Sequence, residues 1–182
     1  MTTTTTVFAA IGAFVLGAAV ALGAEHFVFK ARDQRDAMST IGGFQGWRLS
    51  CPPRTDKSGI CMMSEALARR QGGQVFAELS IAPDKDKTDQ LTVVAPLGIF
   101  LLPGAKVAVG NTVKTVSYKT CLPGGCIATL PIDKGLADAM SKGSSIQVTV
   151  ITADGKSVPL NFSLSGFGDA MAARAVDMAA RK

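Results

Sequence analysis

Alternation of apolar and polar residues is the main pattern of the chain after residue 45. "GWRLSC" puts Trp47, Leu49 and Cys51 on one face, which is the period of a half-buried strand. "SIQVTVITADGKSVPLNFSL" holds two alternating runs around Asp154-Gly155, which predicts a β-hairpin. "QVFAELSI", "TVKTVSY" and "CIATLPI" are also typical of strands, whereas "ICMMSEALARR" fits a helix or a strand.

The long apolar stretch "LTVVAPLGIFLLPGAKVAV" is interrupted by Pro96, Gly98, Pro103 and Gly104. These residues break regular structure, so the stretch predicts two strands joined by a bend rather than a membrane span. The short strands and frequent turns together predict an antiparallel β-sandwich or barrel.

Two helices are expected within or after the strands. "DKGLADAMSKG" begins with Asp133, a suitable N-cap, and ends near Gly143, which predicts one short inserted helix. The tail "GFGDAMAARAVDMAARK" changes to a helical period. Asp169 lies near its start and Arg181 and Lys182 near its end, as the helix dipole prefers.

One face of this C-terminal helix carries Phe167, Met171, Ala175 and Met178. An amphipathic face usually packs against the protein's own core, and this is the simpler interpretation. The alternative is a partner-binding helix, because methionine side chains adapt to varied surfaces.

The N-terminus contains 18 residues without a charge, from Val7 to Ala24. As a helix they would span roughly 27 Å, close to the thickness of a hydrocarbon core. The segment therefore predicts a single transmembrane anchor. A cleaved export signal is the alternative, because Ala19-Val20-Ala21 fits a cleavage site, although no Lys or Arg precedes the apolar run.

Small residues recur every fourth position in this segment, at Ala9, Ala13, Gly17 and Ala21. On a helix they form one stripe, and such stripes let membrane helices approach closely. An alanine-rich export signal could also produce the stripe by composition alone.

The chain thus divides into an anchor or signal over residues 1–30, a linker over 31–45, an exported β-domain over 46–166 and the amphipathic helix over 167–182. Basic residues after the apolar run, such as Lys30 and Arg35, would by the positive-inside tendency keep the C-terminal side in the cytoplasm. The cysteines favour the opposite orientation.

Cys51, Cys61, Cys121 and Cys126 are the four cysteines of the chain. An even number behind an export-type segment indicates disulfides, which persist outside the cytoplasm. Four cysteines allow three pairings, of which the local one is the simplest. Zinc and redox sites remain open, although their usual C-x2-C spacing is not found here.

Composition and residue inventory exclude several function classes. The net charge of +5 comes without a dense basic tract, and the chain has one Tyr and one Trp, so a nucleic-acid surface is not expected. Its one histidine is His26, which leaves the β-domain without the base of a Ser–His–Asp arrangement. We expect no enzyme activity, no cofactor and no metal, and no small-molecule substrate is indicated.

Several of these segments resemble the bacterial invasion-associated locus B family. The resemblance covers about residues 45–172 and is carried by Trp47, the "PLG…LLPG" segment, "YKTCLPGGCIATLPI" and "VPLNFSLSGFGDAM". The family's cysteine pattern maps onto the four cysteines and supports the local pairing. The resemblance implies a small exported protein of a family not known as enzymes, whose name reflects a link to host-cell entry in some members.

Two functions are consistent with these observations. The first is a non-enzymatic accessory subunit, anchored in the bacterial inner membrane, whose disulfide-stapled periplasmic domain binds a larger membrane complex. The alternative is a secreted or envelope-surface factor in host-cell interaction, which is what the resemblance implies.

Overall fold

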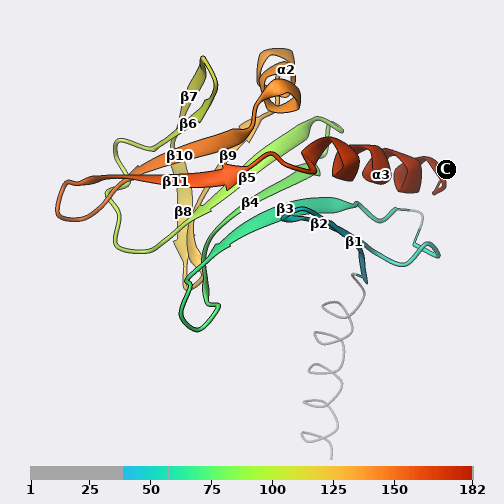
Figure 1. The fold of residues 1–182 in the computed structure, drawn as a ribbon, viewed down its shortest axis with the longest axis horizontal. Coiled ribbons are helices and arrows are strands. Elements are labelled where there is room, and N and C mark those ends of the chain that lie inside the picture. The colour runs from blue at the N-terminus through green and yellow to red at the C-terminus, as the bar shows by residue number, and fades with distance from the viewer. Residues whose placement is uncertain (1–38, 57, 182) are drawn as a thin grey trace, which may run out of the picture. The chain divides into compact units, whose positions relative to one another are not determined.

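Two antiparallel sheets form the framework of the computed structural model (Figure 1). The larger sheet has the strand order β1-β2-β3-β4-β5-β9-β8 and the smaller one β11-β10-β6-β7. The strands of the larger sheet are β1 (Ser39–Phe44), β2 (Trp47–Cys51), β3 (Met62–Ala68), β4 (Val75–Pro83), β5 (Asp89–Ala95), β8 (Tyr118–Leu122) and β9 (Gly125–Pro131). Those of the smaller sheet are β6 (Ala105–Val109), β7 (Thr112–Val116), β10 (Ser145–Ile151) and β11 (Ser157–Ser163). The helices are α2 (Lys134–Lys142) and α3 (Phe167–Ala179).

The structure describes residues 39–56 and 58–181. The predicted anchor and its stripe of Ala9, Ala13, Gly17 and Ala21 lie outside these residues. Neither described helix is long and apolar enough to cross a membrane. From Thr40 onward the described residues belong to one compact unit.

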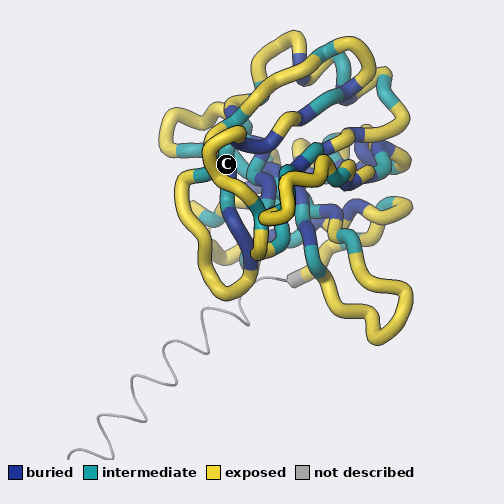
Figure 2. Tube along the Cα trace, turned by 90° about the vertical axis from the view of Figure 1, so that its left-hand side faces the viewer, coloured by how far each residue is buried: buried dark blue, intermediate teal, exposed yellow. Residues whose placement is uncertain are grey.

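Alternation along the strands builds a core between the two sheets. In β4 and β5 the inward residues Leu79, Ile81, Leu91 and Val93 are fully buried, and the antiparallel register sets Leu79 opposite Val93 and Ile81 opposite Leu91. Inward residues of the smaller sheet, such as Phe162, belong to the same hydrophobic cluster. Figure 2 shows this arrangement, with buried segments inside and exposed turns around them. The expected mainly β, sandwich-like fold with two helices is confirmed.

Local signals in the sequence correspond to observed elements. The hairpin around Asp154-Gly155 joins β10 and β11. The Asp133 side chain caps α2 by accepting a 2.8 Å hydrogen bond from the Leu136 N–H. The stretch that fitted a helix or a strand is β3, because it pairs with β2 on one side and β4 on the other.

The predicted linker over 31–45 is too long, because β1 occupies Ser39–Phe44. The strand is followed by a tight turn in which Gln45 and Gly46 both have positive φ angles, of 49° and 117°. Gly166 also approaches β1 so closely that a Cβ there would collide with the Phe44 carbonyl oxygen. The pair Gly42-Gly43, which suggested a linker, lies within β1.

The backbone of Ser163 connects the two sheets through side chains. Its carbonyl oxygen accepts a 2.9 Å hydrogen bond from the indole Nε1–H of Trp47. Its N–H donates a 2.9 Å hydrogen bond to the Glu65 carboxylate. The Trp47 ring also meets the Phe167 ring edge-on, with centroids 5.2 Å apart. This connection, the Ser163 clamp, fixes β2, β3, β11 and the start of α3 together.

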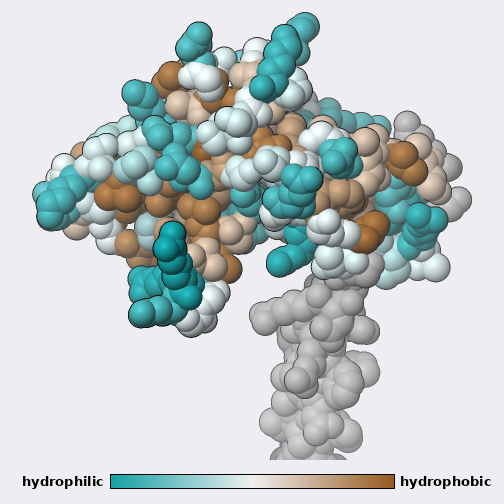
Figure 3. All heavy atoms as spheres, viewed as in Figure 1, coloured by the Kyte–Doolittle hydropathy of each residue, from teal (hydrophilic) through white to brown (hydrophobic). Residues whose placement is uncertain are grey.

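Large apolar side chains are exposed at the end of the domain opposite α3. Leu97, Phe100, Leu101 and Leu102 on the β5–β6 loop have exposed fractions of 56%, 50%, 46% and 99%, and Leu122 at the end of β8 has 53%. The β8–β9 turn lies against the end of β5, where this loop begins, because a Cβ on Gly125 would collide with the Ala95 carbonyl oxygen. We call these five residues the apolar tip. Apolar atoms gather at this left-hand end in Figure 3.

Glu65 makes stability depend on pH. Burial raises the pKa of its carboxyl above the ordinary value of 4.5, although the hydrogen bond from Ser163 opposes the shift. The folded state therefore holds the proton more tightly, and its stabilisation is full below pH 4.5 and is lost as pH rises through the folded pKa. Glu65→Gln does not titrate in this window but keeps an oxygen for Ser163. We expect the unfolding free energy of Glu65→Gln relative to wild type to increase with pH above 4.5.

Urea unfolding of both proteins in detergent, at acidic and neutral pH, measures this difference. Glu65→Ala is the control, because it leaves the Ser163 N–H without its acceptor and should destabilise by about 1–3 kcal/mol at acidic pH. A Gln-minus-wild-type difference that stays constant across the pH range would contradict the assignment.

Candidate functional site

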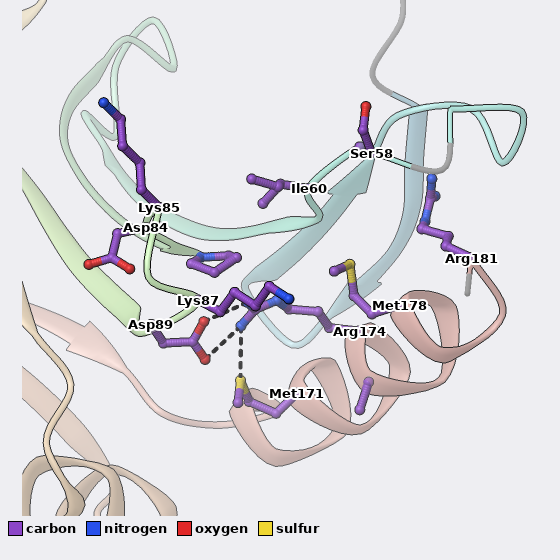
Figure 4. A pocket seen from close by; sticks show the side chains of 13 residues that line it. Ser58, Ile60, Asp84, Lys85, Lys87, Asp89, Met171, Arg174, Met178 and Arg181 are labelled. Atoms are coloured by element: carbon purple, nitrogen blue, oxygen red, sulfur yellow. Dashed lines mark hydrogen bonds and ion pairs between the residues drawn. The ribbon is translucent and has the colours of Figure 1, made fainter.

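A groove of about 720 Å³ lies between α3, the β4–β5 turn and the loop closed by the Cys51–Cys61 disulfide (Figure 4). We call it the α3 groove. Its lining residues are Ser58, Gly59, Ile60, Pro83, Asp84, Lys85, Lys87, Asp89, Met171, Arg174, Ala175, Met178 and Arg181. The volume is within the usual range for ligand-binding clefts in proteins.

The four residues of the predicted face of the C-terminal helix fall into two groups in the structure. Phe167 at its first position is buried against Trp47. Farther along, Met171 and Met178 are half-buried and Ala175 is exposed, and all three line the α3 groove. Phe167 thus packs on the core, and Met171 and Met178 pack partly against it while they also line the groove.

Arg174 and Asp89 form the charged wall of the groove. The guanidinium donates two hydrogen bonds to the carboxylate, of 3.0 Å from Nη1 and 2.6 Å from Nη2. The Arg174 side chain has an exposed fraction of 9%, and its buried Nε has no hydrogen-bond partner among the described residues. This pair joins α3 to the start of β5. It could not be predicted from the sequence, because 85 residues separate the partners.

The β4–β5 turn forms the opposite wall and is held by Asp84. The Asp84 carboxylate accepts hydrogen bonds from the backbone N–H groups of Asp86 and Thr88, at 2.9 and 3.0 Å, and from Gln90 at 2.9 Å. Lys87 adopts a positive φ of 63° within this turn. The Asp84 carboxylate therefore stabilises the turn through these hydrogen bonds.

Lys85 and Lys87 are exposed at the edge of the groove. Within the described part of the chain, neither forms an ion pair. Four basic and two acidic side chains line the groove, so their net charge is positive, although the exposed Asp86 lies between the two lysines. Its apolar lining and two lysines favour an apolar ligand that carries negative charge.

Both disulfides follow the local pairing, Cys51–Cys61 and Cys121–Cys126. The first is fully buried beneath the groove. Cys61 Sγ lies 3.3 Å from a carboxylate oxygen of Asp177, and this is a close contact, because a disulfide sulfur has no proton to donate. Cys51, Cys61 and Asp177 are near enough to resemble a metal-binding group, but both sulfurs are committed to the disulfide.

Arg181 fixes the disulfide loop to the end of α3. Its Nε donates a 2.7 Å hydrogen bond to Asp177, and its Nη atoms donate to the carbonyl oxygens of Pro52, Pro53 and Asp56 at 2.7, 3.2 and 3.2 Å. The hydrogen bond from Arg181 lowers the pKa of the Asp177 carboxyl, while burial opposes the shift. The sequence suggested only a dipole role for Arg181, whereas the structure uses it to hold a wall of the groove.

Comparison with known proteins gives a consistent set of similarities. Residues 47–175 match the family model described as invasion associated locus B (IalB) protein. An invasion protein B homolog of Brucella abortus (strain 2308) is 33% identical over 132 residues, which cover 70% of this chain and 75% of that protein. Invasion protein B of Bartonella bacilliformis is 23% identical over 130 residues, 69% of each chain.

The crystal structure of invasion associated protein b from Bartonella henselae is similar in fold. The TM-score is 0.64 at 23% sequence identity, and the match covers 76% of this chain and 97% of that chain. The strand framework is therefore shared. Asp177 and Arg181 lie beyond the residues that match the family model.

Arg181 and Arg54 offer a matched test of the groove wall, because both bond to Asp177. The Arg181 side chain has an exposed fraction of 3% and that of Arg54 72%. We expect Arg181→Ala to lower the melting temperature by several degrees and to speed hydrogen exchange in residues 52–60, because it leaves buried carbonyls and a buried carboxylate without their donor. Arg54→Ala should change little. Equal effects of the two substitutions would contradict this role of Arg181.

Proposed function

Because the chain belongs to the invasion associated locus B (IalB) family, we propose that it is an exported, non-enzymatic binding protein that holds a partner in the α3 groove. The observation that carries the proposal is the groove itself. Met171, Ala175 and Met178 line it beside a disulfide loop and a turn that are both held by buried or multiply bonded side chains. Binding needs such a pre-formed cleft, and a rigid wall lowers the entropic cost of association.

The partner in this proposal is a protein segment with apolar side chains and at least one carboxylate. Its apolar side chains would pack on Ile60, Met171 and Met178, whose flexible thioethers adjust to an irregular surface. Its carboxylate would meet Lys85 or Lys87, which have no ion pair in the described residues. Charges at the edge of an interface mainly set orientation and association rate.

Our preferred setting is the bacterial inner membrane. Residues 1–30 would anchor the chain, and the β-domain would act in the periplasm as an accessory subunit of a larger membrane complex. Two disulfides support an oxidising compartment. The proposal also explains why four groove residues lie on a terminal helix that continues past the core.

A secreted or envelope-surface role in host-cell interaction is the second candidate. It is favoured by the names of the relatives, which are an invasion protein B homolog of Brucella and invasion protein B of Bartonella. The same groove would then receive a host protein. The two candidates differ in whether the mature chain stays with the membrane and in which protein is bound.

Site-specific photo-cross-linking tests the groove in the native bacterium. A photoreactive amino acid at position 175 replaces Ala175, which lines the groove. The control position is Val176 on the same helix, which is 70% exposed and does not line the groove. We expect Ala175 to give a discrete product with an inner-membrane protein, and Lys85→Glu with Lys87→Glu to reduce its yield several-fold. Val176 should give none. Equal products at both positions would count against the groove, and a product found only in the medium or with host cells would favour the second candidate.

Topology can be tested separately. Alkaline phosphatase fused after Lys182 should be active, because it folds only outside the cytoplasm, where the two disulfides also persist. Fusion to a cytoplasmic protein of similar size gives the inactive reference. An inactive fusion on the full chain would show that the basic residues after the apolar run had set the opposite orientation.

A further inference from the structure

We propose that the apolar tip is a docking surface for membranes that contain anionic phospholipid. The tip is separate from the α3 groove, at the other end of the domain (Figures 1 and 3). Single exposed apolar residues are normal on a protein surface, but a cluster marks an interaction site. Leu97, Phe100, Leu101 and Leu102 lie within six consecutive positions. Leu122 ends β8, and the turn that follows it lies against the last residue of β5, next to which the loop starts.

Hydrogen bonds hold the β5–β6 loop in its outward position. The Phe100 N–H donates to the Ile151 carbonyl at 2.8 Å, and the Ala153 N–H donates to the Gly98 carbonyl at 2.9 Å. The Gly104 N–H closes the loop on the Leu101 carbonyl at 3.0 Å. The leucines are therefore presented to solvent by an ordered backbone, which cannot fold them back into the core.

The shape of the tip suits a bilayer. Leu102 has an exposed fraction of 99% and stands out from the surface. A protruding side chain on a protein partner would need a matching pocket, whereas the fluid interface of a bilayer closes around it. Aromatic and aliphatic side chains partition favourably into the boundary between headgroups and acyl chains.

Charges around the tip determine which bilayer it prefers. The loop over residues 96–104 contains no charged residue. Lys106 follows its end and Lys119 precedes Leu122, and both are exposed and without an ion pair in the described structure. Asp154 on the adjoining β10–β11 turn is paired with Lys156 at 2.6 Å. The net positive charge next to apolar side chains favours anionic headgroups.

Fluorescence quenching by brominated lipids tests insertion of the tip itself, even if residues 1–30 also bind the bilayer. The full chain carries Leu102→Trp and is mixed with vesicles of equimolar brominated phosphatidylglycerol and phosphatidylcholine, or of brominated phosphatidylcholine alone. The native Trp47 is fully buried and gives the background signal in wild type. We expect quenching of Leu102→Trp beyond this background in the anionic vesicles, and much less in the neutral ones.

Matched variants separate insertion at the tip from general adsorption. Val176→Trp, exposed on α3, should stay at background. Lys106→Gln and Lys119→Gln should each reduce the ratio of inserted to free tip by about fivefold in anionic vesicles. Lys85→Gln with Lys87→Gln in the groove should leave quenching unchanged, so failure of the groove proposal does not affect this test. Two outcomes would overturn the proposal. One is background-level quenching of Leu102→Trp in every vesicle, as expected if the tip binds a protein. The other is equal quenching in anionic and neutral vesicles.

Discussion

Ser163 has both of its backbone polar groups bonded to side chains of the opposite sheet, so early and late strands of the β-domain meet there. Trp47 and Glu65 come from the first strands, whereas Ser163 ends the last one. These bonds cross between sheets where no ladder can connect them, and a buried N–H or C=O without a partner would be costly. Because Trp47 also packs on Phe167, the same cluster sets where α3 leaves the core.

The α3 groove follows from that starting point. Phe167 and Ala170 are buried and fix where the helix begins. The following turns of the helix extend past the sheet (Figure 1). Two guanidinium groups then fix its course, since Arg174 bonds to Asp89 and Arg181 to the carbonyls around Pro52. Arg174 and Asp89 form a partly buried ion pair, whereas Arg181 forms a buried one with Asp177 and adds hydrogen bonds to backbone carbonyls. Such pairs specify geometry more than they add stability. The groove is the space between the helix and the two segments to which its arginines are bonded.

The sequence predicted those features that depend on neighbours along the chain. Alternation revealed most strands, the Asp133 cap revealed α2, and the cysteine spacing agreed with the local disulfides. Features that depend on distant partners were missed. "MMSEALA" contains good helix formers, and its pairing with β2 and β4 overrides that propensity. Nothing near Glu65 or Arg174 indicates partners 98 or 85 residues away.

β5 links the groove to the apolar tip. It begins at Asp89, in the groove wall, and ends at Ala95, where the tip loop starts. Its seven residues extend over roughly 20 Å, more than twice the screening length of about 8 Å at physiological salt. The lysines of the groove and those near the tip therefore act on their ligands almost independently, and substitutions at the two ends should combine additively. Because β5 is paired on both sides, with β4 and β9, the spacing is fixed by the sheet. Occupation of one end then needs no rearrangement at the other, as the two proposals together require of one small domain.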